Sequence, residues 1–150
     1  DINHFKPFND AFGYSAGDDA ILQLSRILCE CVDMQHDFVG HVGGDDFFIG
    51  VSDWTREELT EILDRLLSDF HDDVIHLYSE ADRQTGHIKG LDRQGLERDF
   101  PLMRCSIGVL ELPTGLVIDD VNRISAEIAE LKKQAKESAE GLVIGVFGQG

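Results

Sequence analysis

Three acidic residues, Asp1, Asp45 and Asp46, are the first candidates for chemistry in this chain. Asp1 stands at the end of a predicted strand, and Asp45 and Asp46 follow Gly43 and Gly44 at the tip of a predicted hairpin. If the two elements are neighbours in one sheet, these carboxylates converge, and they repel unless they are protonated or hold a cation. Mg²⁺ bound by one or two carboxylates and substrate phosphates is the common solution, and it supports phosphoryl transfer. Residue types alone favour a simpler alternative, a solvated acidic turn.

A second group of polar residues lies in the loop Phe5-Lys6-Pro7-Phe8-Asn9-Asp10 and in Gly17-Asp18. Turn amides and Lys6 can hold phosphates, because both supply donors or positive charge. The amide of Asn9 and the carboxylate of Asp18 offer the donor and acceptor pattern that a guanine edge requires. A surface loop followed by a helix cap is the alternative that the residue types alone favour.

The elements that must position these residues include three amphipathic helices. Apolar residues recur at spacings of three and four from Ala20 to about Asp33, with Asp18 or Asp19 as the predicted cap. The capping box that begins at Thr55 predicts a second helix through Phe70. A third helix is predicted over 122–139. Residues 5–17 are predicted to form a loop or short helical turns, because Pro7, Gly13 and Gly17 interrupt regular structure.

Short apolar runs predict the strands. They comprise the end of a strand at 1–5, a hairpin of 38–42 with 47–51, a strand over 102–112 and a last strand over 142–147. Residues 79–100 predict an extra hairpin around Asp92-Arg93-Gln94-Gly95. Strands that alternate with helices, together with one antiparallel hairpin, predict an α/β fold, or α+β in stricter schemes, with a mixed central sheet flanked by helices.

Composition limits the classes of partner. The 150 residues carry 13 Lys and Arg against 29 Asp and Glu, a formal charge of −16, so DNA and RNA are disfavoured as partners. No apolar run approaches a membrane span, so no direct membrane contact is expected. We expect one domain over residues 1–150, in the cytoplasm. Because the chain begins inside a predicted strand, we expect an N-terminally truncated piece of a longer protein, whose other parts could be membrane-anchored.

Several separated motifs together resemble the GGDEF family of diguanylate cyclase domains. They are Asp-Ile-Asn-His-Phe-Lys at 1–6, Asn9-Asp10, Gly13, Gly17-Asp18, Gly43-Gly44-Asp45-Asp46-Phe47, Ser106-Ile107-Gly108-Val109 and Ala135-Lys136. Agreement of several motifs in order is more specific than one match. The resemblance covers nearly the whole chain apart from 79–100, and it implies the nucleotidyl cyclase-like fold.

The resemblance also implies an activity and roles for residues. In that family, two domains that each hold a GTP with Mg²⁺ meet head to tail and form cyclic di-GMP, so a homodimer is one expected state. Metal ligation, by Mg²⁺ or Mn²⁺, is implied for Asp1, the backbone of Ile2 and Asp45. Catalytic roles fall on Asp45 and Asp46. Nucleotide binding is implied for the following residues: Lys6, Asn9, Asp18, Gly43, Gly44 and Lys136.

Three departures from the family pattern bear on catalysis. Asp46 stands where the signature has Glu, and the loss of one methylene withdraws the carboxylate by more than about an ångström. His41 replaces an Arg, and Glu140 stands where an Arg should meet phosphate. The segment Met34 to Asp37 also lacks the Arg of the family's product-inhibition site, so feedback by cyclic di-GMP is not expected there.

Three functions stay open at this point. The first is a degenerate GGDEF domain that binds GTP or a related guanine nucleotide and regulates an attached domain. The combination of Gly40-His41-Val42-Gly43-Gly44-Asp45-Asp46-Phe47 with the long insertion resembles family members linked to an upstream EAL phosphodiesterase domain. The second is an active diguanylate cyclase that tolerates Asp46. The third is a protein-interaction module with a vestigial site, in which the 79–100 hairpin contacts a partner.

Overall fold

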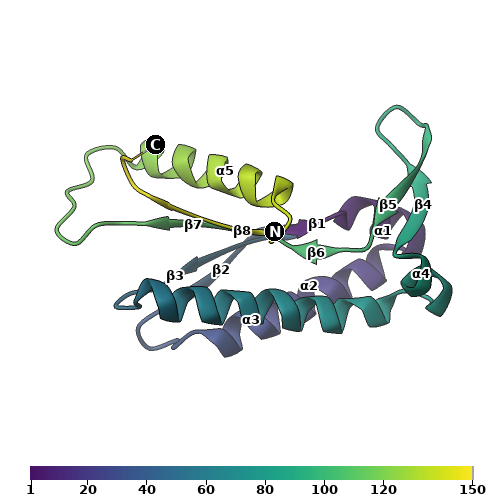
Figure 1. Ribbon diagram of the computed structural model, residues 1–150, viewed down its shortest axis with the longest axis horizontal. Helices are drawn as coiled ribbons and strands as arrows, with labels where there is room; N and C mark the ends of the chain where they lie inside the picture. The colour runs from purple at the N-terminus through teal and green to yellow at the C-terminus, as the bar shows by residue number, and fades with distance from the viewer. Residues whose placement is uncertain (150) are drawn as a thin grey trace. The chain divides into compact units, whose positions relative to one another are not determined.

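The structure, a computed structural model, describes residues 1–149 and divides the chain into two compact units (Figure 1). The larger unit spans Ile2–Cys105, and the smaller unit contains Asp1 and the residues from Ser106 onward. Helices and strands mix in the chain, which confirms the predicted fold class. None of the described helices is both long enough and apolar enough to cross a membrane.

The larger unit contains most of the helices. Its elements are, in order, β1 (Ile2–Asn3), α1 (Phe5–Phe12), α2 (Tyr14–Cys31), β2 (Phe38–Gly43), β3 (Asp46–Gly50), α3 (Arg56–Val74), η1 (Ile75–Leu77), α4 (Glu80–Thr85), β4 (His87–Leu91), β5 (Glu97–Pro101) and β6 (Arg104–Cys105). The fully buried large side chains of the whole structure all belong to this unit: Phe8, Leu24, Leu66, Phe70, Val74 and Met103. They come from α1, α2, α3 and the segment before β6, so these parts share one core.

The smaller unit is built from β7 (Ile107–Glu111), α5 (Val121–Glu137) and β8 (Leu142–Val146). β7 and β8 pair in parallel, from Ile107 opposite Leu142 to Glu111 opposite Val146. Gly108 allows α5 to approach β7, because a Cβ at this position would lie 2.5 Å from the backbone nitrogen of Lys132. The glycine therefore fixes where Lys132 sits over the strand.

The helix predictions were largely right, with one correction. The capping box is present, because Thr55 accepts from the Glu58 N–H and the Glu58 side chain accepts from the Thr55 N–H. Of the two alternatives for residues 5–17, a loop or short helical turns, the structure shows helix, since α1 and the first turn of α2 occupy this segment. Asp18 and Asp19 lie inside α2 and do not cap it.

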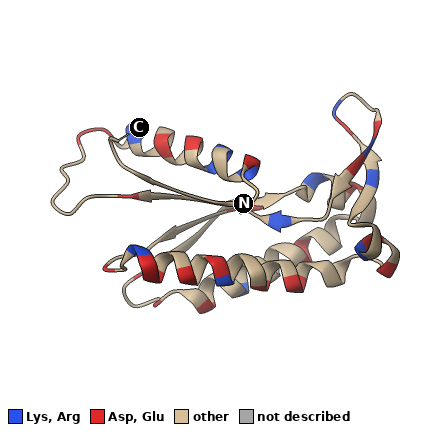
Figure 2. Ribbon diagram, viewed as in Figure 1, with Lys and Arg blue, Asp and Glu red and all other residues tan. Residues whose placement is uncertain are grey.

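Figure 2 shows how the negative charge is distributed in the larger unit, where acidic residues recur along α2 and α3. Arg26 of α2 ties these helices together, since its guanidinium lies 2.6 Å from Asp73 on α3. The pair is half-exposed, so it adds little to stability. The apolar faces of the two helices supply the main packing.

The strand predictions were right in place and partly wrong in pairing. β2 and β3 form the predicted hairpin, from Phe38 opposite Gly50 to Gly43 opposite Asp46. The predicted strand over 102–112 is broken at Ser106: β6 pairs antiparallel with β1, and β7 pairs parallel with β8. In the described part of the chain, β1 is thus hydrogen-bonded to β6 and not to the β2–β3 hairpin.

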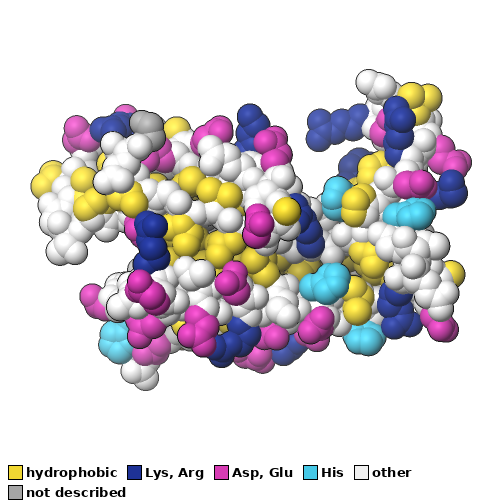
Figure 3. Space-filling view, viewed as in Figure 1, with side chains coloured by type: hydrophobic (Ala, Val, Ile, Leu, Met, Phe, Trp, Pro, Cys, Tyr) yellow, Lys and Arg dark blue, Asp and Glu magenta, His cyan; other side chains and the backbone are white. Residues whose placement is uncertain are grey.

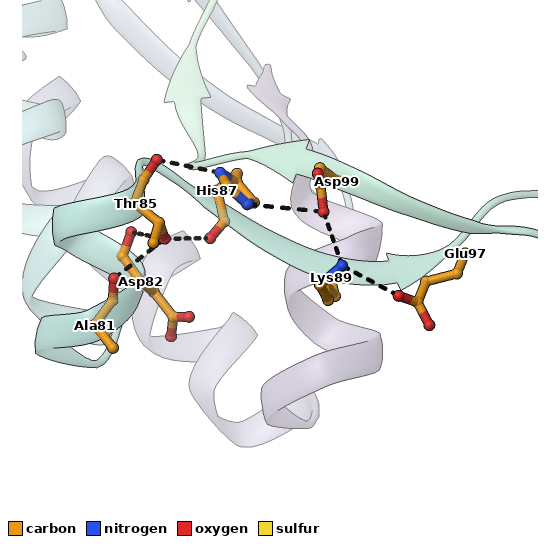
Figure 4. A network of polar contacts seen from close by, with 7 residues as sticks. All are labelled: Ala81, Asp82, Thr85, His87, Lys89, Glu97 and Asp99. Carbon is orange, nitrogen blue, oxygen red and sulfur yellow. Dashed lines mark hydrogen bonds and ion pairs between the residues drawn. The ribbon is translucent and has the colours of Figure 1, made fainter.

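The predicted extra hairpin is present as β4 and β5, paired from His87 opposite Pro101 to Leu91 opposite Glu97. The prediction missed α4, which precedes it. Lys89 bridges Glu97 at 3.2 Å and Asp99 at 3.6 Å across the two strands (Figure 4). The hydrogen bond to Glu97 and the charge of Asp99 raise the pKa of Lys89 above its ordinary value. These exposed contacts favour the observed register.

Candidate functional site

The residues predicted to contact guanine lie at the corner where α1 meets α2. Gly13 breaks the helix with a φ of +89°, a value that side chains other than glycine rarely adopt. Its N–H donates to the carbonyl of Asn9 over 2.8 Å, and the Gly17 N–H donates to the carbonyl of Gly13 over 3.2 Å. The chain therefore turns tightly between Asn9 and Gly17.

The side chain of Asn9 fills the space that Gly17 leaves open. A Cβ at Gly17 would lie 1.7 Å from Asn9 Oδ1, and this oxygen is buried without a hydrogen-bond partner within residues 1–149. The neighbouring Asp18 is exposed, and its carboxylate has no hydrogen bond in the described part of the chain. The structure thus places the amide of Asn9 and the carboxylate of Asp18 at one corner, both with unused hydrogen-bonding capacity.

Lys6 lies on α1, one turn before Asp10. Its ammonium contacts the Asp10 carboxylate at 2.5 Å, and 76% of the Lys6 side chain is exposed. Such a surface pair is weak, so an arriving phosphate can compete for the lysine. Lys6 therefore remains a candidate for binding phosphate.

Gly43 and Gly44 form the turn before Asp46, with φ values of +147° and +56°. A Cβ on either glycine would meet nothing within 4 Å, so the surroundings of the turn are open. Asp45 lies in the turn, and Asp46 is the first residue of β3. Both are half-buried.

His41, the residue in place of the family's Arg, stabilises this turn from within. Its Nε2 lies 2.8 Å from the carbonyl of Gly44, and because a carbonyl only accepts, Nε2–H is the donor. The ring stacks on Phe47 with a centroid separation of 4.5 Å. The imidazole therefore stabilises the turn itself, unlike an Arg that binds phosphate.

Asp37, the last residue of the segment compared with the product-inhibition site, has a structural role. Its carboxylate accepts from the Asp33 N–H at 3.1 Å and from the Ser52 N–H at 3.2 Å, and the residue is 8% exposed. A buried carboxylate that is satisfied by backbone donors holds the loop before β2 against the end of β3.

Asp1 belongs to the smaller unit, where it contacts two lysines of α5. Lys136 Nζ lies 2.7 Å from Asp1 Oδ1, and Lys132 Nζ lies 3.0 Å from Oδ2. Only 6% of the Asp1 side chain is exposed. The sequence analysis singled out Asp1 and Lys136 but not Lys132. Its position four residues before Lys136, on the same face of the helix, was the available signal.

Glu140 lies just after α5, in a turn closed by Ser138. The Ser138 hydroxyl donates to the Glu140 carboxylate over 3.0 Å and accepts from the Glu140 N–H over 3.2 Å. The acidic side chain is exposed. An acid thus stands where the resemblance implied a cation.

The residues implied as metal ligands suit Mg²⁺ or Mn²⁺ by type, since carboxylate and backbone oxygens are the ligands that hard cations prefer. Asp1 lies in the smaller unit, and Ile2 and Asp45 lie in the larger one. Within residues 1–149, no group of three or more His, Cys, Asp or Glu side chains is arranged to hold a metal ion. When bound, a divalent cation would neutralise phosphate charge. Lys6, and the two lysines that contact Asp1, are positive charges of the chain itself that could serve the same purpose.

Comparison with known proteins places this set of residues in one family. The family model described as "Diguanylate cyclase, GGDEF domain" matches residues 1–89, more than half of the chain. The chain therefore belongs to the GGDEF family of diguanylate cyclase domains, and the resemblance drawn from the motifs is confirmed.

Individual relatives agree with this assignment. The chain is 28% identical over 76 residues to the cyclic di-GMP phosphodiesterase PdeB of Shewanella oneidensis, covering 51% of this chain and 9% of that protein. It is 33% identical over 67 residues to the probable diguanylate cyclase DgcI of Escherichia coli, covering 45% of this chain and 15% of that protein. The chain thus matches only a small part of the length of these relatives.

A solved structure shares the fold. The active GGEEF domain of a diguanylate cyclase from Vibrio cholerae aligns with a TM-score of 0.55 and 22% identity, over 100% of this chain and 80% of that one. The structural match includes residues 90–149, which the family model does not cover. The nucleotidyl cyclase-like fold is therefore confirmed for the second part of the chain as well.

Proposed function

We propose that this chain is a single GGDEF domain of cyclic-di-GMP signalling that binds GTP or a related guanine nucleotide and regulates an attached domain. The corner of α1 and α2 carries the proposal, because Asn9 Oδ1 is buried without a partner beside the exposed Asp18. Guanine N1–H and N2–H are donors, whereas Asn9 Oδ1 and the Asp18 carboxylate are acceptors that no donor in the described part of the chain reaches, so the nucleotide would supply the missing hydrogen bonds.

Lys6 and the amides of the Gly43-Gly44 turn, in the larger unit, and Lys136, in the smaller unit, are the proposed phosphate-binding groups. Asp1, Ile2 and Asp45 are the proposed ligands of Mg²⁺ or Mn²⁺, whose charge would add to that of the lysines. Asp46, His41 and Glu140 argue for weak or absent turnover. The Asp46 carboxylate is one methylene shorter than the family's Glu, and the His41 ring is engaged with Gly44.

The attached domain is proposed to be a phosphodiesterase of the EAL type, and a homodimer of GGDEF domains is a further expected state. The similarity to PdeB, which is named a cyclic di-GMP phosphodiesterase, supports the first point. A regulatory role requires two states of the domain that the attached domain can distinguish. A nucleotide that orders the corner of α1 and α2 would create such a pair, one state with nucleotide bound and one without.

Calorimetric titration of GTP into the 150-residue chain, with and without Mg²⁺, tests the binding. We expect measurable heat in the wild type and its loss in Asp18→Ala. Asp19→Ala is the matched control, because Asp19 is the exposed next residue of α2. No heat at millimolar GTP in the folded wild type would refute nucleotide binding.

Turnover separates the regulatory domain from an active cyclase. The chain and Asp46→Glu are incubated with GTP and Mg²⁺ or Mn²⁺, and cyclic di-GMP is measured by chromatography. We expect no product from the wild type and at most partial rescue by Asp46→Glu, since His41 and Glu140 remain. Product from the wild type that Asp45→Ala abolishes would establish the active cyclase instead.

Exposed apolar residues on the β4–β5 hairpin favour a second role, protein interaction. Leu91 and Leu96 are 62% and 51% exposed at the ends of the paired strands, where Figure 3 shows hydrophobic side chains on the surface of the hairpin. In the parent protein, Leu91→Ser with Leu96→Ser should weaken contact with the attached domain, measured by limited proteolysis, and leave GTP binding to this chain unchanged. Unchanged proteolysis would remove this role.

A further inference from the structure

The carboxylate of Asp1 carries a separate ammonium on each of its oxygens. Lys136 Nζ is 2.7 Å from Oδ1, Lys132 Nζ is 3.0 Å from Oδ2, and 6% of the Asp1 side chain is exposed. Oδ1 has no hydrogen bond of acceptable geometry despite the short distance to Lys136. We treat the contact as an ion pair, because charge attraction depends on distance more than on alignment.

The backbone fixes this arrangement from both sides. The Ser106 N–H donates to the Asp1 carbonyl over 2.8 Å, so Asp1 is attached to the chain just before β7. On the other side, Gly108 lets α5 approach closely, because a Cβ at this position would lie 2.5 Å from the backbone nitrogen of Lys132. Leu131 and Ala135, which are 9% and 0% exposed, anchor the adjacent face of α5. Lys132 is therefore placed by packing as well as by attraction to Asp1.

The two ammonium groups supply the same charge as one divalent cation. Each oxygen of the Asp1 carboxylate already faces an ammonium, so a metal ion that approaches the carboxylate meets repulsion from both lysines. The carboxylate is almost fully buried, but the lysine side chains are 31% and 42% exposed, so solvent and salt screen part of this repulsion. A divalent ion must displace at least one lysine to bind there.

We propose that Lys132 is a specificity-determining residue that lowers the affinity of Asp1 for divalent cations and, together with Lys136, replaces their charge. The inference rests on the proposed function only in taking Asp1 as the metal-ligating carboxylate. Lys132 is the decisive residue because its side chain is 31% exposed against 42% for Lys136, and Lys136 can turn toward a phosphate. Nucleotide binding then has a component that does not require Mg²⁺.

Titration of Mn²⁺ in the absence of nucleotide, followed by electron paramagnetic resonance, tests the proposal. We expect Lys132→Met to bind Mn²⁺ at least about tenfold more tightly than the wild type, a small share of the interaction between unit charges a few ångströms apart. Lys133→Met, an exposed neighbour on α5, is the matched control and should leave the affinity unchanged. Adding Asp1→Asn to Lys132→Met should remove the gain.

Equal Mn²⁺ affinity in the wild type and in folded Lys132→Met would overturn the proposal, as would a gain that survives Asp1→Asn. If Lys132→Met is unfolded by circular dichroism, Lys132→Gln, which keeps a polar end, takes its place with the same expectations. Calorimetry with GTP keeps the two ideas apart. GTP binding without tighter Mn²⁺ binding in Lys132→Met would support the proposed function and refute the role of Lys132. Tighter Mn²⁺ binding without GTP binding would support the role of Lys132 and refute nucleotide binding.

Discussion

The corner of α1 and α2 and the turn between β2 and β3 were both predicted to contact the nucleotide, yet they are held in different ways. The corner rests on the core: Phe8 is fully buried, Gly17 is packed against Asn9, and Tyr78 is 4% exposed beside them. The turn projects into open space, with no atom within 4 Å of a Cβ built on Gly43 or Gly44.

This difference shows where each half of the predicted site gets its geometry. Side chains at the corner are oriented by tertiary packing, so their positions depend on the stability of the unit. The turn is oriented by its own glycines and by the His41 contact to Gly44. Substitutions at the corner should therefore change stability and binding together, whereas substitutions at the turn should change stability little.

Phe8→Ala should have the largest effect. Phe8 is 0% exposed and contacts the Tyr78 ring at a centroid distance of 5.0 Å, so truncation removes core packing at the residue just before Asn9. We expect a loss of about 3–5 kcal/mol in unfolding free energy. Urea denaturation measures it, with Phe12→Ala as the control, because Phe12 is 38% exposed and should cost clearly less. Equal losses would mean that the corner does not rest on the core.

Tyr78→Phe comes next in size. The Tyr78 hydroxyl accepts from the buried Met103 N–H over 2.8 Å, and removing it leaves that donor unsatisfied at a cost of about 1–3 kcal/mol. The matched control is Tyr14→Phe, because Tyr14 is 79% exposed and its loss should be close to zero. Similar losses at both positions would show that the buried hydrogen bond contributes nothing.

The same residue predicts a dependence on pH. Burial raises the pKa of Tyr78 from 10.0 to about 12, against a smaller opposing effect of the Met103 hydrogen bond. Because the folded-state pKa is raised, the contribution of Tyr78 is fully present below pH 10 and is lost as the pH rises toward 12. The stability difference between the wild type and Tyr78→Phe should shrink over that window, and a constant difference would contradict the assignment.

How much of this could be predicted from the sequence differs between the two regions. The hairpin, its glycine turn and the capping box at Thr55 were predicted correctly, because local residue types determine them. The full extent of helix α1 was not predicted, because Pro7 left both a loop and short helical turns open. Pro7 lies in the first turn of that helix, where its missing N–H has no helical partner in any case.

Contacts between residues far apart in the sequence could not be predicted, because local residue types do not determine them. The strand pattern over 102–112 cannot show that the chain changes pairing partner at Ser106. The contact of Lys132 with Asp1 could not be predicted either, because only the fold brings these two residues together. The motif residues could be named from the sequence, but the side chains that contact them in the fold could not.

Gly17→Ala probes the close packing of the corner. The new methyl would meet Asn9 Oδ1 at 1.7 Å, and overpacking of this kind costs about 1–3 kcal/mol, partly offset by the better helix propensity of alanine. We expect a net loss of about 1–2 kcal/mol, together with weaker GTP binding. In the double variant with Asn9→Ala the contact is gone, so the loss in urea denaturation should be smaller than the sum of the single losses. Additive losses would show that the two residues do not touch.

Gly44→Ala should have the smallest effect and tests the other half of the comparison. Its φ of +56° lies in the left-handed region, where a residue with a Cβ costs about 1–2 kcal/mol, so we expect a loss near the lower limit, measured by urea denaturation. Gly44→Asn should cost less, since Asn tolerates this region. Gly40→Ala in the same hairpin is the control, because its Cβ would meet Phe48 atoms at 3.9 and 4.0 Å, an ordinary contact. If Gly44→Ala instead cost as much as Phe8→Ala, the turn would have to be packed against something other than its own backbone, and its predicted independence from the core would be wrong.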